Sequence, residues 1–166
     1  GNIGTPLCEA AQHADAGNWM VTELSSFQLK GTTDFRPRIG CLLNLTETHL
    51  DYHGSMEDYA SSKAKMFANQ TEDDTAVLNW DDSYCRSLVP YIKAKLLPFS
   101  VTEELQVGVY VSPPYIPDTE DDLERSIVYR DSDGRSQVII PVKEIGIPGR
   151  FNVANAAAAC AIAIAS

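Results

Sequence analysis

Apolar residues along this chain gather in short, nearly uninterrupted runs that are separated by longer amphipathic stretches. Runs of about four to eight apolar residues are typical of strands covered on both faces, as in a parallel sheet. The pattern predicts buried strands over four ranges: Trp19–Leu24, Arg38–Leu45, Thr75–Asn79 and Lys95–Ser100.

Helical patterns alternate with these runs. Thr5-Pro6 supplies an N-cap and a first-turn proline for a helix through about Ala14. Met56–Asn69 is amphipathic, and a further helix extends from Asp81-Asp82 to about Tyr91. One side of the Met56–Asn69 helix carries Met56, Tyr59, Lys63, Met66 and Phe67. The alternation predicts an α/β fold with a mostly parallel sheet flanked by helices, whose ligands bind beyond the carboxyl ends of the strands.

The pattern changes after residue 107. Short strands are expected at Val107–Val111, Ser126–Tyr129 and Gln137–Val142, the last two joined by the turn signal at 131–134. These strands predict a small antiparallel β subregion over residues 107–147, with an exposed Pro113–Glu124 loop. A last helix, Asn152–Ala165, follows Gly149.

Composition narrows the class of protein. The chain has 166 residues, 44% of them hydrophobic, which suits a single domain with one core. A net charge of −10 repels phosphate backbones, so we expect no nucleic-acid partner. The apolar runs are shorter than the roughly 18 residues that span a bilayer, so we expect no membrane insertion. Four cysteines without CxxC spacing fit a reducing cytoplasm, and Cys41 and Cys160 are expected in the core.

Two acidic or imidazole groups are placed where the predicted strands end. Glu23 ends the run Trp19–Leu24, where a Mg²⁺ ion or a buried cationic partner would compensate its charge. His49 follows the next strand and is either a metal ligand or a hydrogen-bonded structural residue. Asp51 and His53 alternate with His49, and all three converge only if that segment is extended. We interpret His53 as a structural or surface residue.

Lysine and asparagine side chains supply further candidates. Lys63 lies one turn from Tyr59 and from Phe67, so its stem either crosses an apolar face or holds a reactive amine, whereas we expect Lys65 to be solvated. Asn152 and Asn155 are three residues apart and share one helix face. They either cap the start of the helix or contact a nucleotide. The opening GNIG turn resembles an anion site, but the chain contains no GxxxxGK[ST] phosphate loop.

The order of these elements is more specific than any one of them. GNIG, ELSSFQL, NLTxxHLDYH, YxxxKxxxF and GxFNxxN follow one another as they do in the Mur ligases, and the resemblance covers nearly the whole chain. ELSSFQL together with GNIG resembles the D-glutamate-adding branch of that family. The chain then resembles a central ATP-binding domain over residues 1–166, truncated at both ends and without its first strand, loop and helix.

The resemblance implies a reaction and a set of roles. The family uses ATP to phosphorylate the carboxylate of UDP-N-acetylmuramoyl-L-alanine, and the amine of D-glutamate then attacks the acyl phosphate. Two Mg²⁺ ions are implied, one on Glu23 and one on His49 and a CO₂-derived carbamate of Lys63. The residues whose implied role is binding are Asn2, Ser25 and Gln28 for substrate, and Asn152 and Asn155 for nucleotide.

Several alternatives stay open. Thr48, Arg150-Phe151 and the LDYHGSMEDY run are more like the neighbouring ligase that adds the third amino acid. A metal-dependent hydrolase would use His49, Asp51 and His53, whereas the ligase interpretation predicts that His53 is dispensable. A degenerate binding module is the non-enzymatic alternative. We expect a monomer, and we expect the 166-residue chain alone to lack ligase activity and to bind ATP weakly.

Overall fold

A computed structural model describes residues 2–46 and 53–166 of the chain. Its centre is a six-stranded sheet in the order β1 to β6, which follows the order of the sequence. The strands are β1 (Ile39–Leu42), β2 (Thr75–Asn79), β3 (Lys95–Ser100), β4 (Gly108–Ser112), β5 (Ser126–Arg130) and β6 (Ser136–Pro141). β1 to β4 pair in parallel, and β5 and β6 add antiparallel strands, so the fold class predicted from the sequence is confirmed. The last three strands extend the main sheet, because β4 pairs directly with β3.

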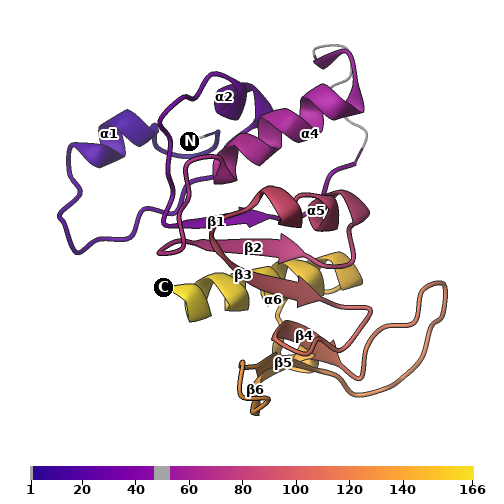
Figure 1. Ribbon diagram of the computed structural model, residues 1–166. Coiled ribbons are helices and arrows are strands. Elements are labelled where there is room, and N and C mark those ends of the chain that lie inside the picture. The colour runs from indigo at the N-terminus through magenta and orange to yellow at the C-terminus, as the bar shows by residue number, and fades with distance from the viewer. Residues whose placement is uncertain (1, 47–52) are drawn as a thin grey trace.

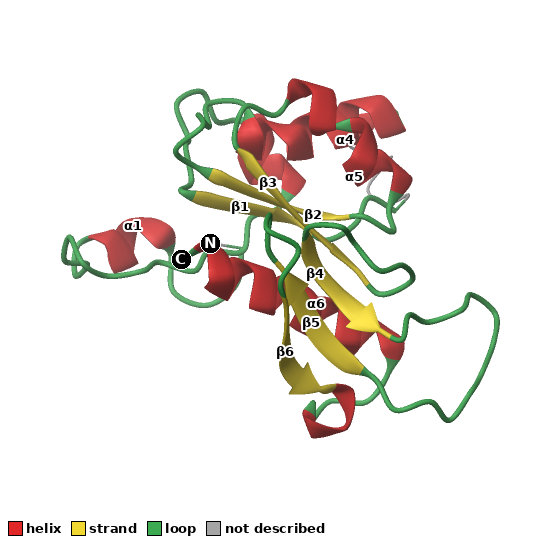
Figure 2. Ribbon diagram, turned by 60° about the horizontal axis from the view of Figure 1, so that its bottom comes forward, coloured by secondary structure: helices red, strands yellow, loops and turns green. Residues whose placement is uncertain are grey.

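Helices cover both faces of the parallel part of the sheet (Figures 1 and 2). α4 (Met56–Ala64), α5 (Ser83–Ser87) and the short helices η1 (Lys65–Phe67) and η2 (Val89–Tyr91) lie on one side, and α6 (Arg150–Ala165) lies on the other. α1 (Leu7–Ala11) and α2 (Ser26–Lys30) come from the N-terminal part, and α2 packs beside α4. A short 3-10 helix, η3 (Val142–Glu144), follows β6. No helix in the described part of the chain has the length and apolar character needed to cross a membrane.

Two hydrophobic cores lie on the two faces of the sheet. Side chains alternate along β2, so Val77 packs toward α6 while Ala76 and Leu78 pack toward α4 and α5. The small residues Ala157, Ala158 and Ala161 are fully or almost fully buried and let α6 lie close to the strands. Cys41 and Cys160 pack against the same core, as the sequence predicted, and burial raises the pKa of the Cys41 thiol to about 12. All four cysteines are free.

The prediction of a buried strand over Trp19–Leu24 is wrong. The segment has no regular secondary structure, and Trp19 and Val21 are 56% and 95% exposed. An apolar run forms a strand only when a neighbouring strand satisfies its backbone N–H and C=O groups and another layer covers its side chains. Among the described residues, no strand pairs with this segment, and no layer buries Trp19 or Val21. Glu23 is therefore exposed, and it does not end a buried strand.

Candidate functional site

α2 begins immediately after the segment that carries Glu23, and its start is locally determined. The Ser25 hydroxyl accepts a hydrogen bond from the Gln28 backbone N–H at 3.3 Å, and the Gln28 side-chain oxygen accepts one from the Ser25 N–H at 3.0 Å. This reciprocal capping box satisfies two N–H groups that a helix start leaves unpaired. Ser25 and Gln28, the predicted substrate contacts, thus have a structural role in the arrangement described.

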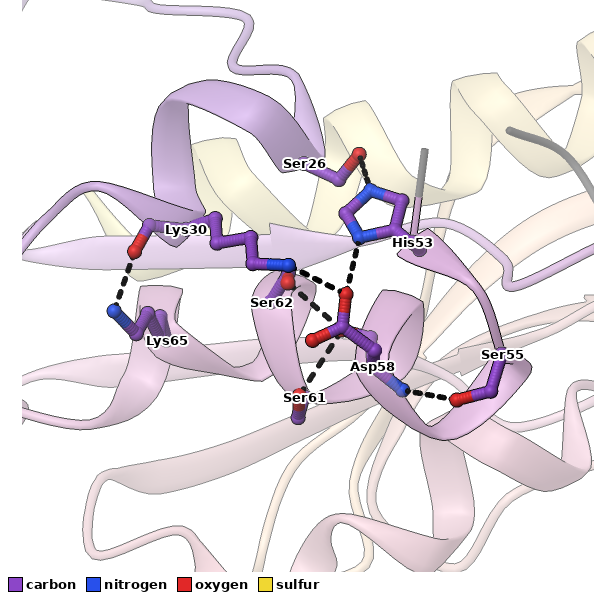
Figure 3. Close-up of polar contacts among 8 residues, drawn as sticks. All are labelled: Ser26, Lys30, His53, Ser55, Asp58, Ser61, Ser62 and Lys65. Atoms are coloured by element: carbon purple, nitrogen blue, oxygen red, sulfur yellow. Dashed lines mark hydrogen bonds and ion pairs between the residues drawn. The ribbon is translucent and has the colours of Figure 1, made fainter. Parts of the chain in front are cut away.

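His53 joins α2 to α4 (Figure 3). One ring nitrogen, Nε2, lies 2.9 Å from the Ser26 hydroxyl, and Nδ1 lies 2.8 Å from Asp58 Oδ2. The side chain of His53 is 0% exposed, and Ser26 is 2% exposed. Because an ionised carboxylate can only accept, Nδ1 of His53 donates to Asp58, and Nε2 and the Ser26 hydroxyl share the second hydrogen bond.

Asp58 is the charged centre of this network. It accepts a 2.7 Å hydrogen bond from the Lys30 ammonium in addition to the bond from His53. Lys30 and, to a smaller extent, His53 hold the pKa of the Asp58 carboxyl below its usual value. The Asp58 backbone N–H is capped by Ser55, and Ser61 and Ser62 donate to its carbonyl oxygen. Asp58 is therefore fixed from its backbone and from its side chain.

The order serine, histidine, aspartate resembles a hydrolytic triad, but the geometry does not support nucleophilic catalysis. Ser26 is 2% exposed, so a substrate has no access to its hydroxyl. Both ring nitrogens of His53 are also engaged by Ser26 and Asp58, which leaves neither nitrogen available to a metal ion. This second observation counts against the metal-dependent hydrolase that requires His53 as a ligand.

Lys63 lies on the face of α4 that the sequence predicted. Tyr59 and Phe67, one turn away on either side, are buried in the core beneath α4, and Met56 and Met66 pack against it. Lys63, between Tyr59 and Phe67 in the sequence, is half-buried. Lys65 is not solvated as expected: its ammonium donates to the Lys30 and Thr32 carbonyl oxygens at 2.5 and 3.1 Å. The prediction failed because those carbonyls, at the end of α2, lie more than thirty residues away in the sequence.

The remaining candidates lie in three places. The Asn2 N–H donates to the Glu23 carbonyl oxygen at 2.8 Å, so the opening turn and Glu23 are adjacent. Asn152 is half-buried in the first turn of α6 and donates to the Pro148 carbonyl oxygen, while Asn155 is exposed on the same helix. His49 and Asp51 lie outside the described residues. Within the described ranges, no group of three or more His, Cys, Asp or Glu side chains is placed to hold a metal ion.

Comparison with known proteins places this arrangement in a family. The Mur ligase middle domain family matches residues 2–163, so the chain belongs to that family. The UDP-N-acetylmuramoylalanine–D-glutamate ligase of Geobacillus sp. (strain WCH70) is 45% identical over 163 residues, which is 98% of this chain and 33% of that protein. The ligase of the same name from Bacillus subtilis (strain 168) is 41% identical over 162 residues, 98% of this chain and 32% of that protein. The chain thus spans about a third of the length of these relatives.

A solved structure supports the fold. MurF from Acinetobacter baumannii superimposes with a TM-score of 0.56 at 20% identity, covering 78% of this chain and 26% of that one. At this level of identity the likeness concerns the fold alone.

Proposed function

We propose that this chain is the ATP-binding middle domain of a cytoplasmic, monomeric ligase that adds D-glutamate to UDP-N-acetylmuramoyl-L-alanine. The observation that carries the proposal is 39–45% identity, over 98% of the chain, to ligases named for that substrate and that amino acid. Similarity of this extent to relatives of one name favours the D-glutamate branch over the ligase that adds the third amino acid.

The reaction is a phosphoryl transfer followed by amide formation. The terminal phosphoryl group of ATP passes to the carboxylate of the precursor, and ADP is released. The amine of D-glutamate then attacks the acyl carbon, the carbon–oxygen bond to phosphate breaks, and phosphate leaves as the amine loses its proton. Catalysis of such a transfer depends mainly on positioning and on neutralisation of the phosphate oxygens.

Glu23, His49 and Lys63 would hold the two Mg²⁺ ions of this reaction. The donor chemistry fits, because Mg²⁺ prefers oxygen ligands and the Glu23 carboxylate is exposed and forms no ion pair with any described residue. A lysine ammonium would repel the ion, so Lys63 fits only as a carbamate, formed when its neutral amine adds CO₂ and loses a proton. Bound Mg²⁺ would neutralise charge on the transferring phosphoryl group.

The other residues would bind the reactants. Asn2 lies beside Glu23 and would contact the precursor, with Ser25 and Gln28 at the start of α2. Asn152 and Asn155, at the start of α6, would contact the nucleotide. Ser25 and Gln28 can do so only while they keep, or exchange, the hydrogen bonds of the capping box.

A chimeric enzyme tests the proposal. Residues 2–163 of this chain would replace the matching segment of the Bacillus subtilis relative, and ADP release would be followed with UDP-N-acetylmuramoyl-L-alanine and a panel of amino acids. We expect activity with D-glutamate only. A folded chimera that is inactive, or that prefers the precursor carrying two residues and a diamino acid, would contradict the proposal. The isolated 166-residue chain is the control without activity.

Single substitutions in the chimera test the proposed ligands. Lys63→Ala and Glu23→Gln should each lower kcat by about 100-fold or more, because each removes charge stabilisation present mainly in the transition state. Lys93→Ala, at an exposed lysine outside the α2–α4 pair, is the control and should keep kcat within about threefold, a cost near 0.6 kcal/mol. ¹³C NMR after incubation with labelled bicarbonate should give a carbamate signal that Lys63→Ala removes. Equal activity of the Lys63 and Lys93 variants would argue against the assignment.

A further inference from the structure

The buried imidazole of His53 is held from both helices at once. Beyond its two hydrogen bonds, its ring stacks on Phe27 of α2 with centroids 5.5 Å apart and 25° between planes. Tyr59 of α4 approaches it at 5.3 Å with the planes tilted by 55°. Each helix therefore supplies one polar partner and one aromatic ring, and the imidazole fills the space between them.

The two helices are joined at both of their ends. His53 links Ser26 to Asp58 where α2 and α4 begin, and Lys65 donates to the Lys30 carbonyl oxygen where they end (Figure 3). Lys65 also donates to the Thr32 carbonyl oxygen, just after α2. The ion pair from Lys30 to Asp58 adds a partly exposed contact between these points. Two separated attachments fix the rotation of one helix against the other, which a single attachment would leave free.

Two of the proposed magnesium ligands belong to this region, one on α4 and one in the segment just before α2. Glu23 lies just before the capped start of α2, and Lys63 lies one turn after Tyr59, whose ring touches His53. Tyr59 and Lys63 share a helix face, so a rotation of α4 that moved Tyr59 would move Lys63 with it. The separation of Glu23 from Lys63 thus depends on how α2 and α4 are packed.

We propose that His53 is a positioning residue that sets the placement of Lys63 relative to Glu23 by locking α4 against α2. The inference rests on the proposed function only for its catalytic consequence, since the locking itself is a property of this chain. It replaces the expectation from the sequence that His53 is dispensable. His53 need not touch substrate or metal for this role.

A graded series of substitutions separates the contacts. His53→Asn can keep a donor to Asp58, His53→Gln can keep an acceptor for Ser26, and His53→Phe keeps only the ring contacts. We expect Lys63 to become about tenfold more reactive toward an acylating reagent in His53→Phe, the order expected when buried hydrogen-bonded partners are lost. The Asn and Gln variants should fall between His53→Phe and the unsubstituted chain, and mass spectrometry of the labelled lysines measures each rate.

Controls distinguish positioning from loss of stability. Gly134→Ala strains a turn in the β5–β6 hairpin and should leave the labelling of Lys63 unchanged at matched loss of melting temperature. Exposed Lys93, outside the helix pair, is the internal reference for reagent reactivity and should keep its rate in every variant. Ser26→Ala should raise the labelling of Lys63 in the parent chain but not in His53→Phe, because the contact is already gone. An increase at Lys63 in Gly134→Ala equal to that in His53→Phe, at matched loss of melting temperature, would overturn the proposal.

The catalytic arm uses the chimeric ligase. His53→Phe should lower kcat by about tenfold and raise the Mg²⁺ concentration for half-maximal rate, while KM for ATP changes by less than about twofold. If the chimera is inactive, the proposed function fails and the labelling experiment still decides the role of His53. If the chimera is active and His53→Phe alters neither Lys63 labelling nor the Mg²⁺ dependence, the positioning role is excluded.

Discussion

Gly108 is the residue at which the backbone is most tightly constrained. Its φ angle is +129°, and a Cβ atom added there would lie 2.4 Å from the Pro98 carbonyl oxygen. β4 starts at this residue, so the close approach to β3 is part of the pairing that joins the two halves of the sheet. A side chain cannot be accommodated without moving one strand away from the other.

Gly108→Ala should therefore destabilise the chain by about 3 kcal/mol, through unfavourable φ and overpacking against backbone. Gly134→Ala is the matched control, because its φ is +80° but nothing lies within 4 Å of the added Cβ. It should cost about 1 kcal/mol. Urea unfolding followed by circular dichroism measures both, and equal costs would show that contact with Pro98 is not the cause.

Residue roles could be predicted only where the partners are close in sequence. Tyr59 and Phe67 were predicted correctly to lie on one buried side, because helical periodicity places them together. His53 was not recognised as a link between helices, since Ser26 lies 27 positions away and no local pattern marks the pair. The roles of Glu23, His49 and Lys63 remain predictions.

At the level of elements, Asp82 connects the end of the first parallel strand with the helix after the second. Its Oδ1 accepts from the Cys85 N–H at 2.9 Å as the N-cap of α5, and its Oδ2 accepts from the Leu45 N–H at 3.1 Å. One carboxylate thus fixes both the start of a helix and the backbone three residues after β1.

Asp82→Ala should lower the free energy of unfolding by about 2 kcal/mol, from the lost cap and from the unpaired Leu45 N–H. Asp82→Asn keeps an acceptor oxygen for Cys85 and should cost less than half as much. Hydrogen exchange of the Leu45 and Cys85 amides would show where each variant opens. Unchanged protection at Leu45 in Asp82→Ala would contradict the assigned link.

Strand predictions succeeded where the sheet itself supplies partners. β2 and β3 have the ranges that their apolar runs predicted, Thr75–Asn79 and Lys95–Ser100, since each pairs on both sides. Trp19–Leu24 has an equally apolar sequence and no strand partner among the described residues. An apolar sequence indicates that a segment is stabilised by burial. Whether other elements are present to bury it depends on the rest of the fold.

At the scale of the whole molecule, buried or partly buried carboxylates are paired with cations in three separate regions. Asp58 pairs with Lys30 beside α2, and Asp74 pairs with Arg36 before β2. The cation is the largest cause that lowers the pKa of each carboxyl. The same electrostatic arrangement therefore recurs at positions far apart in the fold.

The third pair joins Asp121, within the Pro113–Glu124 loop, to Arg125, which follows that loop. Arg125 holds the pKa of the Asp121 carboxyl at about 2 and lies 4.2 Å from the centroid of the Tyr115 ring. Arg150, in the first turn of α6, lies over the same ring at 4.9 Å. Tyr115 thus ties the base of the exposed loop to the last helix.

These pairs predict acid sensitivity. Each folded-state pKa lies below the unfolded value of about 3.9, so the stability from the pairs is complete above pH 4 or so and is lost as pH falls through the folded values. The melting temperature should fall between about pH 4 and pH 2, the latter being the value for Asp121. Asp74→Asn should flatten the slope of melting temperature against pH, and a wild-type slope in that variant would contradict the account.

Strand β2 separates the two hydrophobic cores, since Ala76 and Leu78 contribute to one core and Val77 contributes to the other. A bulkier residue at Ala76 could be accommodated only if β2 moved toward α6. That displacement would overpack Val77 against α6. The packing of the helices near Lys63 is thus connected to the packing of α6 near Asn152 through the strands of the sheet, β2 among them. A substitution that enlarges side chains in one core therefore requires smaller side chains in the other core.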